Sequence, residues 1–500
     1  TSSLDLGVDF PAVDQVLQVG SPKGMARLWQ RGGRAKHRPG EEGKVICVPT
    51  HALELAEYAA ARVALAHGRV ESRPPLRLSL DVLAQHCVTL ALGGGFEPRQ
   101  LLAEVRGTHA FAGLSDDAWQ AVLDFIIRGG SALEHYPDYR RVIHDDDGCY
   151  RVHDRRIAFR HRLSIGTITS DGSVQVRYMK GGYLGSVEEA FISRLQPRER
   201  FQFAGKTLEL VQLRDMTAYV RIAKAGEGRI PRWQGGRMPL SSELGAEVEA
   251  ILHTPSDSPE MHALQPLLTL QERLSALPSP ETLLVESLKT RQGWHTFVYP
   301  FAGRAVHEGL AALVALRWGR EAPNTFGWAV NDYGLVLTAQ TAASPDASLL
   351  QRLLTPERLL EDLILSLNIA ELARRQFREI ARVAGLLPPS LPGRAARSLR
   401  QLQASSSLLF DVLRQHDPGH VLLAQAEREV MDAQLDVQRL REVLERCRDR
   451  TLALHHPSSL TPLGFPLWAE AIRGQLSTED WRTRVVRAAQ QLETRHARNA

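Results

Sequence analysis

The chain has 500 residues, of which 43% are hydrophobic and 24% charged, with a formal net charge of +4. This length predicts about three or four globular domains, since one domain usually takes roughly 100–200 residues. No apolar run is long enough to span a bilayer and no signal-peptide pattern opens the chain, so we expect a cytoplasmic protein without membrane contact. The four cysteines form no CxxC pair, which argues against a structural zinc site and a disulfide framework.

Residues 1–68 have the pattern of part of an α/β unit. AVDQVLQVG (12–20) predicts a buried strand, and Pro22 fits the start of a helix through SPKGMARLW. KVICVPT predicts another strand, and the Ala-rich stretch 51–68 predicts a helix that ends at Gly68.

Residues 69–161 have the pattern of a winged helix. LSLDVLAQHCVTLAL, EPRQLLAEV and SDDAWQAVLDFII have helical apolar spacing, with Ser115 as the N-cap of the third. RRVIHDDDGCYRVHD predicts a hairpin, and three helices closed by a hairpin make a winged helix. HDDDG lacks the spaced ligands and distal glutamate of a calcium loop, so we interpret it as the wing turn.

Strand patterns dominate from residue 162 and helical patterns after 345. LSIGTITSDGSVQVRYM predicts a hairpin that turns at Asp171-Gly172, and RFQFAGKTLELVQLRDMTAYVRIAK predicts two more strands. Residues 240–320 mix helix and strand, and 426–450 read as one long charged helix. The fold class is therefore multidomain α/β and α+β.

Two stretches in the first 40 residues form a pattern together. TSSLDLGVDF precedes the first strand, and QRGGR follows about twenty residues later. By itself QRGGR is a solvated basic loop, but together the two stretches resemble motifs V and VI of superfamily 2 helicases. The run TSSLDLGVDFPAVDQVLQVGSPKGMARLWQRGGRAKHR is similar to the large helicase-related (Lhr) family. The C-terminal helices resemble the bacterial ligase-associated Lhr-core type most.

This resemblance implies four parts. They are the C-terminal part of a RecA-like domain (1–68), a winged helix (69–161), a β-rich and α+β Lhr-associated domain (162–345), and its mainly helical C-terminal region (346–500).

The resemblance implies half of an ATP site. In the family, ATP lies between two RecA-like domains, and motif VI supplies arginines that reach its phosphates. Arg34 matches the motif arginine best and Arg31 is second, since a guanidinium binds two phosphate oxygens and stabilises charge at the γ-phosphate. Gly7, Asp9 and Gln30 are implied as further ATP-binding residues.

Three neighbouring residues carry further expectations. Gly33 is expected to permit a tight turn. Lys36 stands where the family usually has glycine, which is a departure from the pattern. His37 matches the family's usual histidine, for which a structural and a catalytic role remain open.

Two motifs that a helicase needs are absent from this sequence. FAGKTLEL (203–210) contains GKT, but Arg200 occupies the position of the required glycine and the segment alternates like a strand. No DExH run occurs. By the family's layout, the first RecA-like domain and part of the second would lie before Thr1, which is not a natural start residue. We expect the complete protein to use ATP and Mg²⁺, and this chain alone to lack ATPase activity.

A basic segment predicts contact with nucleic acid. Residues 151–239 contain 17 Lys and Arg against 8 Asp and Glu, a net of +9. They extend into GRIPRWQGGRMPLS (228–241), where Arg232 can meet a phosphate and Trp233 can stack on a base. The alternative is that Trp233 is a domain-interface residue. The resemblance also implies Thr1 and Ile165 as nucleic-acid contacts. On sequence alone Ile165 is simply a strand residue.

The resemblance implies a parent that is a 3′–5′ ATP-dependent DNA helicase of bacterial DNA repair. Its substrates would be single-stranded DNA with duplex DNA or an RNA:DNA hybrid, and a DNA ligase and a nuclease are candidate partners. A non-enzymatic winged-helix DNA-binding or scaffold module is the alternative.

Overall fold

The computed structural model describes residues 13–36, 43–72, 75–167, 173–179, 181–188, 198–203, 206–214, 217–223, 239–254, 257–366, 369–387, 399–472 and 481–497. The chain groups into two compact units. The first combines 1–73, 238–368 and 431–500, and the second combines 74–237 and 369–430. Each unit is therefore built from segments that lie far apart in the sequence, whereas the four consecutive domains stay a prediction.

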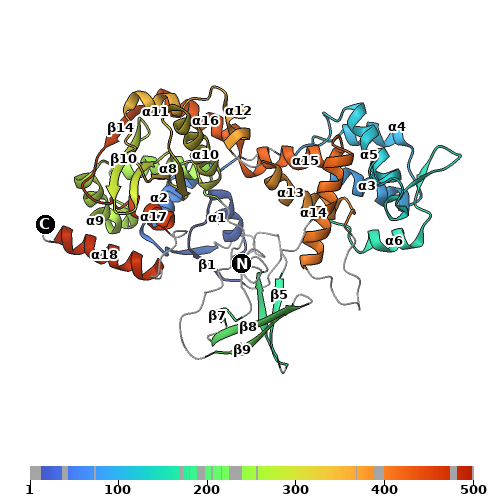
Figure 1. Ribbon diagram of the computed structural model, residues 1–500, viewed down its shortest axis with the longest axis horizontal. Helices are drawn as coiled ribbons and strands as arrows, with labels where there is room; N and C mark the ends of the chain where they lie inside the picture. Colours follow the sequence, from blue (N-terminus) through green and yellow to red (C-terminus); the bar gives the residue numbers. More distant parts are fainter. Residues whose placement is uncertain are drawn as a thin grey trace. The chain divides into compact units, whose positions relative to one another are not determined.

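The opening segment is a β-α-β unit followed by a helix (Figure 1). Its strands β1 (Gln15–Val19) and β2 (Lys44–Val48) pair in parallel, and the helices are α1 (Met25–Gly32) and α2 (Ala52–Ala66). The expected strands and helices are thus confirmed.

Two details of this segment were wrong. β1 is not buried throughout, because its residues alternate and Leu17 and Val19 are 61% and 65% exposed. Pro22 does not start the helix, which begins at Met25 after an irregular turn. In that turn Lys23 has a φ of +63°, which lies outside the right-handed helical region, so the helix cannot include it.

The first unit also contains a five-stranded mixed sheet in the order β12-β13-β11-β10-β14. Only β10 and β14 pair in parallel, and the other neighbours are antiparallel. The strands are β10 (Thr282–Thr290), β11 (Gly293–Val298), β12 (Phe326–Val330), β13 (Leu335–Ala339) and β14 (Thr451–His455). The helices of this unit after α2 are α8 (Ser242–His253), α9 (Pro259–Leu274), α10 (Arg304–Glu321), α11 (Ala347–Leu353), α12 (Leu359–Ser366), α16 (Val437–Asp449), α17 (Gly464–Ala471) and α18 (Trp481–Ala497).

One apolar core joins the opening segment to this sheet. Met25 of α1 and Leu53 of α2 are buried in the same cluster as Val248, Leu284 and Trp468. Full burial of a large apolar side chain contributes about 1.5–3 kcal/mol. The helix that carries Arg31 and leads into Arg34 is therefore held by the core of the whole first unit.

The second unit begins with the three helices and the hairpin that a winged helix would have. Helices α3 (Leu80–Leu92), α4 (Pro98–Arg106) and α5 (Asp116–Arg128) are closed by the hairpin of β3 (Ile143–His144) and β4 (Tyr150–Arg151). The hydroxyl of Ser115 accepts the backbone N–H of Ala118, which confirms the N-cap of α5. In the wing turn, Asp145 and Asp147 both bind Arg151, so the acidic run is paired with an arginine.

A second five-stranded sheet in this unit differs from the expectation. Its order is β6-β5-β9-β8-β7, around a small core of its own. Residues 163–167 are not a strand, because β5 pairs with β6 and β9 instead, and the expected turn at Asp171-Gly172 lies outside the described residues. The stretch 200–224 holds three strands rather than two. The strands are β5 (Ser173–Tyr178), β6 (Tyr183–Glu188), β7 (Arg200–Phe203), β8 (Lys206–Arg214) and β9 (Thr217–Ile222).

The expected long helix at 426–450 is broken. α15 (Val421–Glu429) is followed by a π-helical turn (Val430–Gln434), and α16 begins after Asp436. Asp436 has a φ of +44° and its carboxylate accepts the N–H of Arg439, so it caps a new helix. The break lies where the chain passes from the second unit to the first. The remaining helices of the second unit are α6 (Arg155–Arg162), α13 (Ile369–Val383) and α14 (Leu399–His416).

The described residues contain neither a membrane span nor a metal cluster. None of the helices in this part of the chain is both long and apolar enough to cross a membrane. Nowhere among the same residues do three His, Cys, Asp or Glu side chains gather as metal ligands would.

Candidate nucleotide and nucleic-acid sites

The two candidate arginines lie on consecutive turns at the end of α1. Arg31 is in the last turn of the helix, and the backbone N–H of Arg34 donates to the carbonyl of Arg31 at 3.1 Å. The next residues are fixed as well, because the N–H of Lys36 donates to the carbonyl of Val13 at 2.7 Å. The chain thus presents both guanidinium groups from one short, hydrogen-bonded segment.

The glycine requirement differs from the expectation. Gly33 has φ −65° and ψ 0°, which any residue can adopt, so the expected tight turn is not the reason for that glycine. Gly32 is the constrained position, since a Cβ there would lie 2.9 Å from Cγ2 of Val45. Lys36 has a φ of +47°, the left-handed conformation that favours glycine. The lysine therefore stands at a strained position that glycine would adopt without strain.

Arg31 is tethered to the first strand. Its Nη1 donates to Oε1 of Gln18 at 2.6 Å, and Nε2 of Gln18 donates to the carbonyl of Gly20 at 2.9 Å. Gln18 is buried near the carboxyl end of β1, the edge where ligands bind in parallel α/β sheets. Sequence reasoning missed Gln18, because a lone glutamine in a strand carries no signal of this contact.

The other expected nucleotide-site residues divide into two groups. Gln30 lies in α1 and is exposed. Gly7, Asp9 and His37, together with the nucleic-acid candidate Thr1, lie outside the described residues.

A largely buried ion pair holds the loop that precedes α1. Nζ of Lys23 lies 2.8 Å from Oδ2 of Asp332, 309 positions away in the sequence. Oδ1 of Asp332 accepts the backbone N–H groups of Leu240 at 2.9 Å and Arg304 at 3.1 Å. Burial favours the neutral carboxyl, but the Lys23 charge and these N–H groups outweigh it, and the pKa of Asp332 is lowered.

A fully buried carboxylate reinforces this contact. Oε1 of Glu57 accepts the hydroxyl of Tyr333 at 2.5 Å, and its other oxygen accepts the hydroxyl of Ser21. Burial is the main cause that raises the pKa of Glu57, although Lys23 opposes it. The loop before α1 is thereby locked to the turn between β12 and β13.

Asp332→Asn should lower the free energy of unfolding at pH 7 by about 3 kcal/mol, because a largely buried lysine loses its partner. A lowered carboxyl pKa stabilises the fold above the ordinary value of about 4, and this contribution is lost as pH falls further. The gap between wild type and variant should therefore shrink below about pH 4. Urea unfolding of wild type and Asp332→Asn from pH 7 to pH 3 measures this difference in free energy of unfolding, with the exposed Asp449→Asn as control. A difference that stays constant with pH would contradict this role of Asp332.

Hydrogen bonds from the Gln85 side chain hold the backbone on both sides of Ile165, whose side chain is exposed to solvent. Its side chain is 55% exposed, and it lies in an irregular segment after α6, so the strand expected there is wrong. Nε2 of Gln85 donates to the carbonyls of Ser164 at 3.4 Å and Gly166 at 3.2 Å. Oε1 of Gln85 accepts the N–H of Gly166 at 2.9 Å. One buried glutamine thus fixes the backbone on both sides of an exposed apolar residue.

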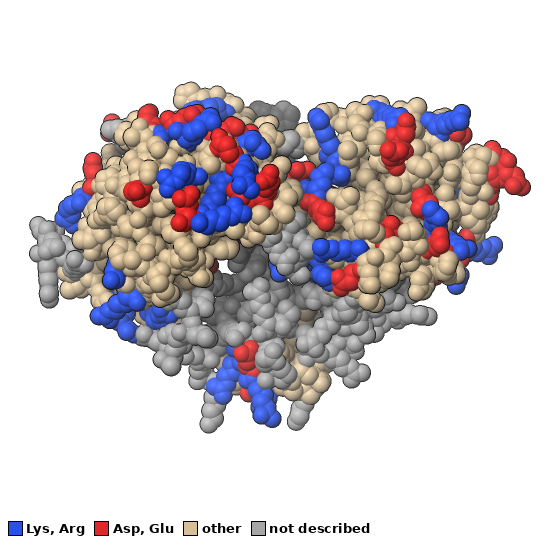
Figure 2. All heavy atoms as spheres, turned by 45° about the horizontal axis from the view of Figure 1, so that its top comes forward, with Lys and Arg blue, Asp and Glu red and all other residues tan. Residues whose placement is uncertain are grey.

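The small sheet carries cations beside tyrosine rings. The Arg177 guanidinium lies 5.8 Å from the ring centre of Tyr183, which is 59% exposed. Nζ of Lys206 lies 5.7 Å from the ring centre of Tyr178. Figure 2 shows Lys and Arg side chains, with an acidic side chain beside them, at the lower end of the view. Cations and exposed rings are the groups with which proteins bind single strands.

The structure describes one of two expected features of the basic segment, the GKT run at Lys206, but not the other, the pair Arg232 and Trp233. Lys206, from the GKT run, lies at the start of strand β8, so the strand that its alternating pattern predicted is confirmed. Arg232 and Trp233 lie outside the described residues.

Comparison with known sequence families covers both units. Residues 63–230 match the winged helix domain of large helicase-related protein, and residues 277–464 match the DEAD/H associated family. The first match contains the winged helix and the small sheet, and the second contains the larger sheet.

Individual relatives extend over almost the whole chain. ATP-dependent helicase Lhr-Core protein 2 of Thermococcus barophilus is 26% identical across 94% of this chain and 57% of its own length. Lhr helicase/probable uracil glycosylase of Mycolicibacterium smegmatis is also 26% identical, across 93% of this chain and 32% of its own length. The chain therefore spans a little more than half of the length of the first relative and about a third of the length of the second.

A solved structure has the same fold. Mycobacterium smegmatis helicase Lhr bound to ssDNA and AMP-PNP matches with a TM-score of 0.68 and 24% identity, over 93% of this chain and 58% of that one. Two family matches, relatives along nearly the full chain and this fold agree with one another. The chain belongs to the large helicase-related (Lhr) family.

Proposed function

We propose that this chain is the C-terminal portion of an ATP-dependent DNA helicase, and that it supplies the motif V and VI half of the ATP site. The observation that supports this most is the placement of Arg31 and Arg34 at the end of α1, beside the carboxyl end of β1. The core and the Lys23–Asp332 pair hold that helix rigidly, and phosphoryl transfer depends on such positioning.

The two arginines have different tasks in this proposal. Arg34 contacts the γ-phosphate and stabilises the charge that develops there. Arg31 binds phosphate while its link to Gln18 keeps it oriented. Gln30, with Gly7 and Asp9, completes this side of the nucleotide site. ATP supplies the phosphoanhydride bond. Among the described residues no three His, Cys, Asp or Glu side chains gather as metal ligands would, and we assign no step to the metal here.

The nucleic-acid surface in this proposal belongs to the second unit, apart from Thr1, which belongs to the first. Ile165 contacts the tracked strand, the arginine and lysine side chains meet phosphates, and Trp233 stacks on a base beside Arg232, with Thr1 as a further contact. The clamp by Gln85 supports a binding role for Ile165, because an exposed apolar side chain on a fixed backbone loses little entropy on binding.

The wider role is part of the same proposal. The parent enzyme moves 3′ to 5′ along single-stranded DNA in the bacterial cytoplasm, and unwinds duplex DNA or RNA:DNA hybrids during DNA repair. It belongs to the ligase-associated Lhr-core type, with a DNA ligase and a nuclease as partners. Unwinding assays with 3′- and 5′-tailed substrates of both kinds test the polarity and the preferred duplex.

The 500 residues alone should bind single-stranded DNA but not hydrolyse ATP. The sequence contains neither GxxxxGK[ST] nor DExH, and two arginines cannot by themselves bind Mg²⁺ or position water. Phosphate release with and without DNA, normalised to the complete protein, measures this. DNA-stimulated turnover that copurifies with this chain through several columns would contradict it.

The alternative is a winged-helix module that binds DNA without enzymatic activity. The same assay on the complete protein separates the two. DNA-stimulated ATP hydrolysis coupled to unwinding supports the helicase, and DNA binding without turnover supports the module.

A further inference from the structure

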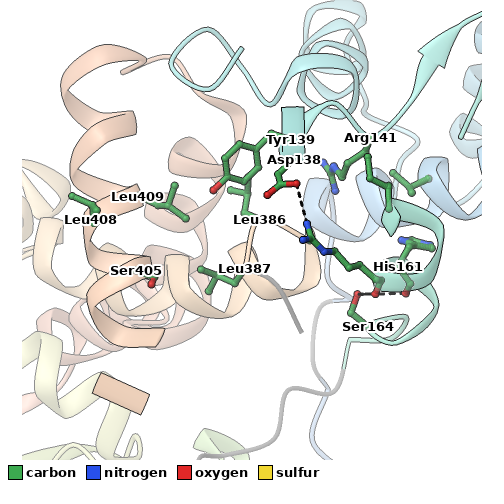
Figure 3. Close-up of a pocket in the computed structure, with 14 residues that line it drawn as sticks. Asp138, Tyr139, Arg141, His161, Ser164, Leu386, Leu387, Ser405, Leu408 and Leu409 are labelled. Carbon is green, nitrogen blue, oxygen red and sulfur yellow. Dashed lines mark hydrogen bonds and ion pairs between the residues drawn. The ribbon is translucent and has the colours of Figure 1, made fainter. Parts of the chain in front are cut away.

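A cavity of about 380 Å³ lies within the second unit. Figure 3 shows Tyr139, Asp138 and Arg141 on one side of it and Ser405 and Leu409 of α14 on the other, and Leu408 of α14 also belongs to the lining. Its volume falls in the range of pockets that take small molecules or single groups of larger ligands.

Arg141 is the unusual residue of this cavity. It is 8% exposed, and its guanidinium carbon lies 4.4 Å from the ring centre of Phe125. Nη1 donates to the carbonyl of Ala384, whereas Nη2 is buried with no hydrogen-bond partner among the described residues. Burial lowers the pKa of Arg141 only to about 10, so the side chain is charged at neutral pH. A buried charge without an anion is costly, and an anionic ligand would offset that cost.

Three further ionisable residues of the lining, Asp138, Arg160 and His161, are more exposed than Arg141. Nη1 of Arg160 pairs with Oδ1 of Asp138 at 3.2 Å, and both side chains are partly exposed. Nε2 of His161 lies 2.8 Å from Oγ1 of Thr89. Burial, and then the Arg141 charge, lower the pKa of His161 to about 4, so it is neutral at pH 7. Two arginines against one aspartate leave the lining with a net positive charge.

We propose that this cavity binds a phosphate group, with Nη2 of Arg141 as its buried donor and Arg160 at the mouth. Arginine suits this task because its planar guanidinium donates parallel hydrogen bonds to two oxygens. The phosphate belongs either to a nucleic-acid strand or to a free phosphate ester. Ser164 lines the cavity and precedes Ile165, so a strand that contacts Ile165 passes beside the mouth. The site does not depend on ATP hydrolysis.

Titration of the chain with inorganic phosphate, against chloride at equal ionic strength, tests the site. We expect saturable binding that Arg141→Met weakens about tenfold or more, since a charge-assisted hydrogen bond is lost. Because Arg141 also contacts Phe125 and Ala384, Leu408→Trp provides a second variant. Leu408 is 64% exposed, so a larger ring is tolerated there and narrows the cavity.

The control variant is Arg155→Gln, an exposed arginine on α6 that does not line the cavity; Arg160→Gln on the same helix should weaken binding several-fold. Non-saturable binding, or equal affinity in Leu408→Trp and wild type, would overturn the proposal.

A single-stranded oligonucleotide identifies the source of the phosphate. If the strand supplies it, Leu408→Trp weakens oligonucleotide binding and inorganic phosphate competes with the strand. If a free ester supplies it, phosphate binding responds to Leu408→Trp while oligonucleotide affinity does not. Loss of ATPase activity in the complete protein would leave both results unchanged, so the site and the helicase proposal fail separately.

Discussion

Arg34→Ala in the complete protein should reduce ATP hydrolysis by about 10³-fold or more while DNA binding stays close to wild type. An arginine at the γ-phosphate stabilises transition-state charge, and its loss is expected to cost this much. The core that holds α1 does not depend on the Arg34 side chain, so the fold should remain intact. Steady-state phosphate release and a DNA titration on the same preparation measure the two effects.

Two further variants sharpen this result. Arg34→Lys should recover little activity, because lysine retains the charge but not the two-pronged geometry. Lys44→Ala removes an exposed cation from neighbouring β2 and should leave turnover unchanged. Normal ATP turnover in Arg34→Ala would show that the motif VI assignment is wrong.

Trp233→Ala should weaken single-strand binding by about 1–3 kcal/mol, which is roughly 5- to 150-fold in affinity. In the complete protein it should reduce unwinding more than ATP hydrolysis, because the stacking contact couples the two. Trp233→Phe should retain much of the function, since an aromatic face remains. Arg232→Ala should instead flatten the salt dependence of binding, as the loss of one phosphate contact does.

A melting curve beside each binding titration separates stacking from packing. Trp328→Ala, which removes a tryptophan that is 44% exposed on β12, is the matched control and should leave DNA affinity unchanged. If Trp233→Ala lowers the melting temperature while the affinity of the folded protein is unaltered, Trp233 is an interface residue and the stacking role is refuted.

Local sequence patterns predicted individual helices and strands well, but they predicted poorly which strands pair with one another. The helices of the winged helix and the Ser115 cap are confirmed, because helical periodicity and capping act within a few residues. The hairpin expected around 163–179 was wrong, since strand 173–178 pairs with strands further along the chain. Alternation indicates that a segment is a strand, but a partner strand is chosen by contacts across the fold.

The candidate nucleotide site divides in the same way, into residues that a local pattern predicts and residues that only long-range contacts bring to the site. The QRGGR stretch points to Arg31 and Arg34 through residue type and family resemblance alone. The residues that orient them, Gln18 and the Lys23–Asp332 pair, carry no local signal, because each contact joins positions far apart in the chain.

By itself, the sequence determined the residue types of the nucleotide motif, most secondary structure and the family, since these depend on short-range pattern. Tertiary structure decided that the opening segment shares one core with residues 238–368 and 431–500. It also decided that Lys36, rather than Gly33, occupies the left-handed position, and that the Arg141 guanidinium is buried in a cavity wall. The physical reason is that burial and charge pairing depend on which distant segments pack together, and this chain builds each unit from separate stretches.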